Sequence, residues 1–174
     1  TRYYVMFEDG KVKIRGVELR QHNTPEFLKN AQQEMLTVFK EANTATEFRA
    51  LLPTSVEILR EFAVAIREDC VDHSELVCTT TVSKDIATYK VNTLPKSALL
   101  QLQDLGVQVQ PGQSVRYIVT DEYAQNYKRR VCLAEKMQGS EDIDVQYYLR
   151  QLAKCAESLL IPFGYTKETL GEML

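Results

Sequence analysis

The sequence has little of what metal or thiol chemistry needs. It contains two histidines, His22 and His73, and four scattered cysteines at positions 70, 78, 132 and 155, with no Cys-x-x-Cys pair. Structural zinc sites take their ligands from closely spaced cysteine and histidine pairs, so we predict no metal site. We expect the cysteines to be small buried apolar residues and the histidines to be exposed polar ones.

A catalytic constellation is also missing. His73 with Cys70 or Cys78 is the nearest approach to a nucleophile and base, and its spacing matches no specific motif. The acids of residues 141–144 lie where a helix is expected to begin, and acids stabilise a helix N-terminus without any chemistry. We therefore predict no catalytic residue.

Long apolar runs are absent as well. No stretch reaches the ~18 apolar residues that a membrane span needs, and the chain opens with Thr1-Arg2-Tyr3-Tyr4 rather than a secretory leader. These features predict a soluble, cytoplasmic protein with no membrane partner. The opening inside a predicted strand suggests a piece of a longer protein.

The chain has no excess of positive charge. It carries 21 Lys and Arg against 24 Asp and Glu, a formal net charge of −3, which argues against a strongly basic nucleic-acid-binding domain. The cations cluster, however, in residues 11–20, 84–90 and 128–130. These clusters therefore have two interpretations. One is a basic binding face on an acidic protein, and the other is a merely solvated face.

Alternating side chains predict β-structure in several places. Strand-forming residues 2–7, a turn at 8–11 and a return strand at 12–15 predict one hairpin. Residues 107–110 and 115–119 flank the turn dipeptide Pro111-Gly112 and predict a second hairpin. Residues 76–82 and 131–133 are further strand candidates.

Apolar residues at helical spacing predict the helices. The expected helices cover residues 27–42, 46–52, 56–66 and 95–105. Pro53-Thr54-Ser55 caps the third of them, and Gly106 ends the fourth. A last helix starts at Asp142 or Asp144 and stops before Pro162 and Gly164. With 174 residues and 44% hydrophobic content, the chain can bury a core in one domain or two small lobes, and its fold class is α+β.

Several short motifs follow one another in order along nearly the whole chain. They are Gly16-Val17-Glu18-Leu19-Arg20 with Thr24-Pro25-Glu26-Phe27, Lys84-Asp85 with Tyr89-Lys90, Gly106-Val107 through Pro111-Gly112-Gln113 to Tyr117-Ile118-Val119, Asp144-Val145-Gln146-Tyr147-Tyr148, and Phe163-Gly164-Tyr165. As an ordered set, they resemble the C-terminal region of family B DNA polymerases of the archaeal type.

The resemblance implies a thumb, the part that grips the primer–template duplex next to the palm. It implies an α+β fold with a helical base and a small tip that contains a β-hairpin. The expected parts are a palm-proximal hairpin at 1–23, a helical base at 24–70, an α+β tip at 71–140, and a C-terminal helix at 141–174 that packs back on the base. The expected partners are duplex DNA and the palm with the remaining domains, or a large subunit.

The chain departs from the family pattern at three places. Tyr3 matches the tyrosine of a Lys-Lys-x-Tyr motif, but Thr1 stands where a lysine is usual. Gln21-His22-Asn23 replaces an Arg-Arg-Asp-like segment, and Lys96 stands where many relatives have histidine, in a position to reach a phosphate. The catalytic carboxylates lie upstream of the matched region, so we expect an inactive chain with no cofactor of its own and Mg²⁺ in the palm of the parent polymerase.

Lysine and arginine neutralise phosphates, and neighbouring aromatic side chains fix their position. On this basis the candidate DNA contacts are Arg2, Tyr3, Lys13, Arg15, Arg20, Lys84, Tyr89, Lys90 and Arg116. Two alternatives remain. One is a non-catalytic docking subunit of a split or inactive polymerase, and the other is a thiol-dependent enzyme with a Cys/His pair.

Overall fold

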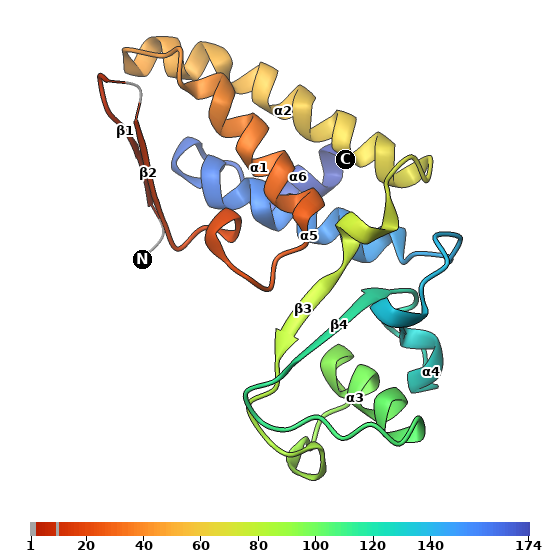
Figure 1. Ribbon diagram of the computed structural model, residues 1–174. Coiled ribbons are helices and arrows are strands. Elements are labelled where there is room, and N and C mark those ends of the chain that lie inside the picture. The colour runs from red at the N-terminus through yellow and green to blue at the C-terminus, as the bar shows by residue number, and fades with distance from the viewer. Residues whose placement is uncertain (1–2, 10) are drawn as a thin grey trace. The chain divides into compact units, whose positions relative to one another are not determined.

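The computed structural model describes the whole chain except residues 1, 2 and 10 (Figure 1). The chain divides into two compact units. Unit 1 consists of Thr1–Val71 and Tyr148–Leu174, and unit 2 of Asp72–Tyr147. The division at 1–23, 24–70, 71–140 and 141–174 stays a prediction.

Unit 1 opens with the predicted hairpin, formed by β1 (Tyr3–Met6) and β2 (Val12–Arg15) in an antiparallel pair. The Asp9 carboxylate closes the turn, because it accepts the backbone N–H of Lys11 at 3.0 Å and its ammonium at 2.7 Å. These bonds hold the pKa of Asp9 below its ordinary value. A short 3₁₀ helix, η1 (Glu18–Arg20), follows the hairpin.

Four helices make up the rest of unit 1. They are α1 (Glu26–Phe39), α2 (Ala45–Arg67), most of α5 (Val145–Leu160), and α6 (Lys167–Met173), with the 3₁₀ helix η5 (Ile161–Phe163) between the last two. Their apolar faces form a core in which Met35, Leu59 and Leu152 are fully buried. The ring of Phe48 stacks on Phe39 and on Phe163, with centroids 4.1 and 4.9 Å apart. This stack joins α1, α2 and η5.

The expected break before Pro53 does not occur. Helix α2 runs unbroken from Ala45 to Arg67 with Pro53 inside it. Pro53 is exposed, and the buried stripe of Ser55, Val56 and Leu59 continues directly after it. Burial of this stripe outweighs the hydrogen bond that proline cannot make. Helix α6, which Thr166 and Thr169 begin with a capping box, was not predicted from the sequence.

Unit 2 contains a three-stranded antiparallel sheet in the order β3-β4-β5. Its strands are β3 (Cys78–Thr81), β4 (Ser114–Val119) and β5 (Val131–Leu133). Its helices are α3 (Leu94–Asp104) and α4 (Tyr127–Arg130), with the 3₁₀ helices η2 (His73–Leu76), η3 (Ile86–Thr88) and η4 (Ala134–Lys136).

The predicted hairpin around Pro111-Gly112 is wrong in one arm. Residues 107–110 form no strand, and β4 pairs instead with β3, with Cys78 opposite Tyr117. The turn returns the chain onto β3, because Gly112 donates to the Val82 carbonyl at 2.7 Å and Val82 donates to the Gln113 carbonyl at 2.8 Å. Gly112 has φ +93°, which suits glycine.

The predicted burial of the cysteines and the predicted exposure of the histidines hold only in part. Cys78 and Cys155 are buried, whereas Cys70 is exposed. His22 is exposed as predicted, whereas His73 is buried and its Nδ1 lies 3.3 Å from the Glu141 carboxylate. Within the described part of the chain, no helix is both long enough and apolar enough to span a membrane.

Candidate nucleic-acid interface

The β1–β2 hairpin brings three of the candidate residues to one face. In its register Tyr3 lies opposite Arg15, and Val5 lies opposite Lys13. Residues directly opposite in an antiparallel pair project to the same side. Lys13 and Arg15 are exposed and Tyr3 is half-buried, so this face presents two cations beside one tyrosine.

Tyr4, on the opposite face of the hairpin, fixes it to unit 1. The Tyr4 ring stacks near Phe48, with centroids 6.4 Å apart, and its hydroxyl donates to the Leu159 carbonyl at 3.5 Å. Burial raises the pKa of Tyr4 to about 12, so the group stays a neutral donor. The hairpin thus turns the face of Tyr4 to the core and leaves the face of Lys13 and Arg15 outward.

Arg20 reaches the surface at the end of η1. The buried amide of Gln32 holds η1, because its oxygen accepts from Leu19 N–H at 2.7 Å and its nitrogen donates to the Glu18 carboxylate at 2.9 Å. The same nitrogen donates to the Cys155 carbonyl on α5 at 2.7 Å. This network ties the segment that carries Arg20 to the core of unit 1.

Unit 2 carries the remaining four candidates. Lys84 and Lys90 are exposed on either side of η3, Tyr89 is half-buried at its end, and Arg116 is exposed on β4 opposite Thr79. The structure therefore places Tyr3, Lys13, Arg15 and Arg20 on one unit and these four on the other. Arg2 lies outside the described residues.

Within the described part of the chain, the exposed candidate cations form no ion pair. Among the described residues, no carboxylate lies within 4.0 Å of Lys13, Arg15, Arg20, Lys84, Lys90 or Arg116. Paired cations elsewhere, such as Lys11 with Asp9, are already neutralised. The candidate cations therefore keep their full charge for an anionic partner.

Other cations bind within the protein. Lys96 donates from Nζ to the Tyr89 carbonyl at 2.7 Å, so the sequence-based expectation of a phosphate contact competes with this internal bond. Arg130 donates to the Glu122 carbonyl at 2.9 and 2.7 Å and to the Asn92 carbonyl.

Lys128 lies 3.0 Å from Asp104, which also accepts the Tyr127 hydroxyl at 2.6 Å. These two donors lower the pKa of Asp104, and the carboxylate raises that of Lys128. The basic run 128–130 is thus largely structural.

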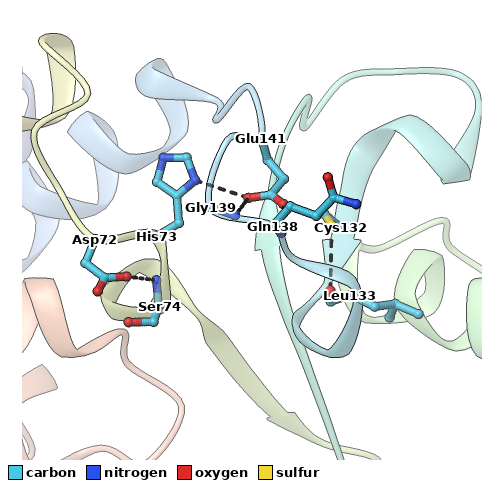
Figure 2. A network of polar contacts seen from close by, with 8 residues as sticks. All are labelled: Asp72, His73, Ser74, Cys132, Leu133, Gln138, Gly139 and Glu141. Carbon is cyan, nitrogen blue, oxygen red and sulfur yellow. Dashed lines mark hydrogen bonds and ion pairs between the residues drawn. The ribbon is translucent and has the colours of Figure 1, made fainter.

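Figure 2 shows a second polar network in unit 2, around Glu141. Its carboxylate accepts the backbone N–H groups of Gln138 and Gly139 and lies 3.3 Å from Nδ1 of His73. The bond from Gln138 does most to hold the pKa of Glu141 below its ordinary value. Burial raises the pKa of the Cys132 thiol, so Cys132 does not support the thiol-dependent alternative.

The described part of the chain offers no binding site for Mg²⁺. No group of three or more His, Cys, Asp or Glu side chains there could hold a metal ion. The residues present therefore do not fit the Mg²⁺ that the resemblance places in the palm of the parent polymerase.

The chain is similar to archaeal DNA polymerases over nearly its whole length. It is 28% identical to DNA polymerase 1 of Saccharolobus solfataricus over 170 residues, and 26% identical to DNA polymerase 2 of Aeropyrum pernix over the same number. Each alignment covers 97% of this chain and 19% or 20% of the relative. The chain thus spans about a fifth of these relatives.

The structure of the family B DNA polymerase from Pyrobaculum calidifontis has a similar fold. The TM-score is 0.71 at 22% identity, over 91% of this chain and 20% of that one. This likeness confirms the predicted α+β fold class. The sequence profile described as DNA polymerase family B matches residues 2–163, and the chain therefore belongs to DNA polymerase family B.

Proposed function

We propose that this chain is the thumb portion of a family B DNA-directed DNA polymerase and holds primer–template duplex through the phosphate backbone. The observation that carries the proposal is the outward face of the β1–β2 hairpin, where Lys13 and Arg15 stand beside Tyr3. Cations bind phosphates whatever the base sequence, and a flanking aromatic group restricts their position.

The overall charge of −3 does not oppose this proposal. Charges more than about 10 Å apart are largely screened at 0.1 M salt, so a phosphate responds mainly to nearby groups. Arg20 in unit 1 and Lys84, Lys90 and Arg116 in unit 2 add further cations that have no carboxylate partner among the described residues. The proposed contacts are thus local basic surfaces on an acidic protein.

Binding of the 174-residue chain to a fluorescent primer–template duplex, measured by anisotropy at several salt concentrations, tests the proposal. We expect the Lys13→Ala/Arg15→Ala variant to bind at least about ten-fold more weakly at low salt, and its log–log salt slope to fall by about 1.8, or 0.9 per phosphate lost.

The matched control is Arg49→Ala/Arg67→Ala. It removes two exposed cations from α2 in the same unit. If the control and the hairpin variant lose affinity equally, only bulk charge matters and the hairpin is not a contact surface. If the wild-type chain does not bind duplex at low salt, the proposal is wrong for the chain alone.

A second candidate function is docking on the rest of a split or inactive polymerase. An apolar groove of about 680 Å³ in unit 1 favours it. Its lining includes Tyr3, Tyr4, Phe48, Ile161, Pro162 and Phe163. Ile161 at its edge is 57% exposed, and Val5 and Phe7 of the hairpin region are exposed as well. The groove does not follow from local sequence patterns, because its two halves are more than 100 residues apart in the chain.

Sedimentation with a family B polymerase that lacks its matching fifth tests docking. We expect a complex with the wild-type chain and its loss with Ile161→Glu, because a charge in an apolar contact is costly to bury. Val64→Glu is the control, since Val64 is 47% exposed on α2. Absence of any complex with the wild-type chain contradicts this second candidate.

A further inference from the structure

We infer that Lys96 is a positioning residue, which fixes the loop of Lys84, Tyr89 and Lys90 for phosphate binding. This inference rests on the proposed function. The ammonium of Lys96, on the first turn of α3, reaches back seven residues and donates to the Tyr89 carbonyl at 2.7 Å. A bond of this length from a charged donor is stronger than a neutral one.

The bond acts on the peptide group that leads into Lys90. The Tyr89 carbonyl and the Lys90 N–H belong to one planar peptide unit, so fixing the oxygen also fixes the plane from which Lys90 departs. On the other side of this peptide, Tyr89 N–H donates to the Ile86 carbonyl at 3.2 Å and closes η3. The two bonds hold Tyr89 between α3 and η3.

Lys96 itself is well anchored. Its backbone N–H lies 3.4 Å from the Thr93 hydroxyl, which caps α3, and its side chain is half-buried. Arg130 acts on the same segment, because it donates to the Asn92 carbonyl and to the Ser97 hydroxyl at 3.4 Å. Two cations therefore hold the carbonyls of Tyr89 and Asn92, directly after the exposed basic loop.

Lys84 and Lys90, in contrast, are exposed. A flexible basic loop must be ordered when it binds, and this cost lowers the affinity. Ordering the loop in advance through Lys96 removes part of that cost. The expected role of Lys96 is thus to raise affinity through Lys84 and Lys90, without its own contact to a phosphate.

Hydrogen exchange of the 174-residue chain tests the positioning without any DNA. We expect Lys96→Met, which keeps an apolar stem and loses the donor, to speed exchange of the Thr88 and Tyr89 amides at least about five-fold. Lys96→Arg should restore much of the protection, because guanidinium is also a charged donor. The Tyr117 amide on β4 should be unchanged, which shows that unit 2 is still folded.

A double-mutant cycle on duplex binding separates positioning from direct contact. We expect Lys96→Met to weaken binding roughly five-fold in the wild-type chain and to have little further effect in Lys84→Ala/Lys90→Ala. Lys136→Met, at another exposed lysine of unit 2, is the charge control.

If Lys96→Met weakens duplex binding equally in both backgrounds, Lys96 is itself a phosphate contact and the inference is overturned. Unchanged hydrogen exchange at the Thr88 and Tyr89 amides overturns it as well. If the wild-type chain does not bind duplex, the proposed function fails, and the exchange measurement still decides whether Lys96 holds the loop.

Discussion

Tyr3 lies directly opposite Arg15 in the β1–β2 ladder, so their side chains leave the hairpin on the same face. Tyr4, the next residue, projects to the other face and donates its hydroxyl to the Leu159 carbonyl. The hairpin is therefore held by one tyrosine and presents the other beside a cation. This arrangement gives the two outward residues separable roles in duplex binding.

The separate roles of Arg15 and Tyr3 predict different salt dependences. Arg15→Ala should weaken duplex binding and lower the log–log salt slope by about 0.9, because one phosphate loses its cation. Tyr3→Phe should leave the slope unchanged, since it removes no charge. Anisotropy titrations at several salt concentrations measure both. A slope that Arg15→Ala leaves unchanged would show that Arg15 binds no phosphate.

Local patterns predicted much of the fold, and long-range choices did not follow from them. The first hairpin and α3 were predicted correctly, because alternation, helical spacing, Pro95 and Gly106 are all local features. The predicted partner of β4 was wrong, because Val107 and Val109 alternate with polar residues as in a strand. The actual partner, β3, lies 33 to 39 residues before the positions with which it pairs.

The candidate site shows the same difference between local features, which could be predicted, and long-range contacts, which could not. The cationic face of the hairpin follows from alternation along two neighbouring strands, so it could be predicted. The internal roles of Lys96 and Arg130 could not, because their acceptors are backbone carbonyls. Every residue has such a carbonyl, so no side-chain pattern identifies the one that a lysine will reach.

The Gln32 network predicts a large loss of stability on a nearly volume-conserving change. Gln32→Leu should lower the free energy of unfolding by about 2–4 kcal/mol, because Glu18 is a buried carboxylate and loses a donor. Urea denaturation followed by far-UV circular dichroism measures it. Gln33→Leu, at the exposed neighbouring position, should change stability by less than about 0.5 kcal/mol. Equal losses of unfolding free energy in the two variants would mean that the buried hydrogen bonds of Gln32 do not stabilise the protein.

The Glu141 network predicts a pH-dependent difference. The bonds from Gln138, His73 and Gly139 lower the pKa of Glu141 from 4.5. The ionised carboxylate therefore stabilises unit 2 fully above about pH 4.5, and this contribution is lost as the pH falls through the lower folded value.

Glu141→Gln should thus lower the Tm near neutral pH, and the difference from wild type should shrink as the pH falls below about 4.5 and through the lower folded pKa of Glu141. Thermal denaturation of both proteins across this range measures it. Because carboxylates elsewhere titrate alike in both proteins, the part of the difference that is lost below about pH 4.5 reports on Glu141. A difference that stays constant with pH would rule out this ionisation as its cause.

Pro53 predicts a stabilising substitution. Inside α2, proline leaves the Arg49 carbonyl without its usual N–H donor. Replacing it with alanine gains about 3 kcal/mol of helix propensity and loses about 1 kcal/mol, because the unfolded chain becomes more flexible. We therefore expect Pro53→Ala to raise the free energy of unfolding by about 2 kcal/mol in urea denaturation.

Thr54→Ala, at the exposed position beside it, controls for helix propensity alone and should gain less than about 0.7 kcal/mol. Only Pro53→Ala should bring the larger gain, because only it restores a hydrogen bond inside the continuous helix α2. Proline is favourable only at the start of a helix, so a loss of stability on Pro53→Ala would contradict its place in the helix interior.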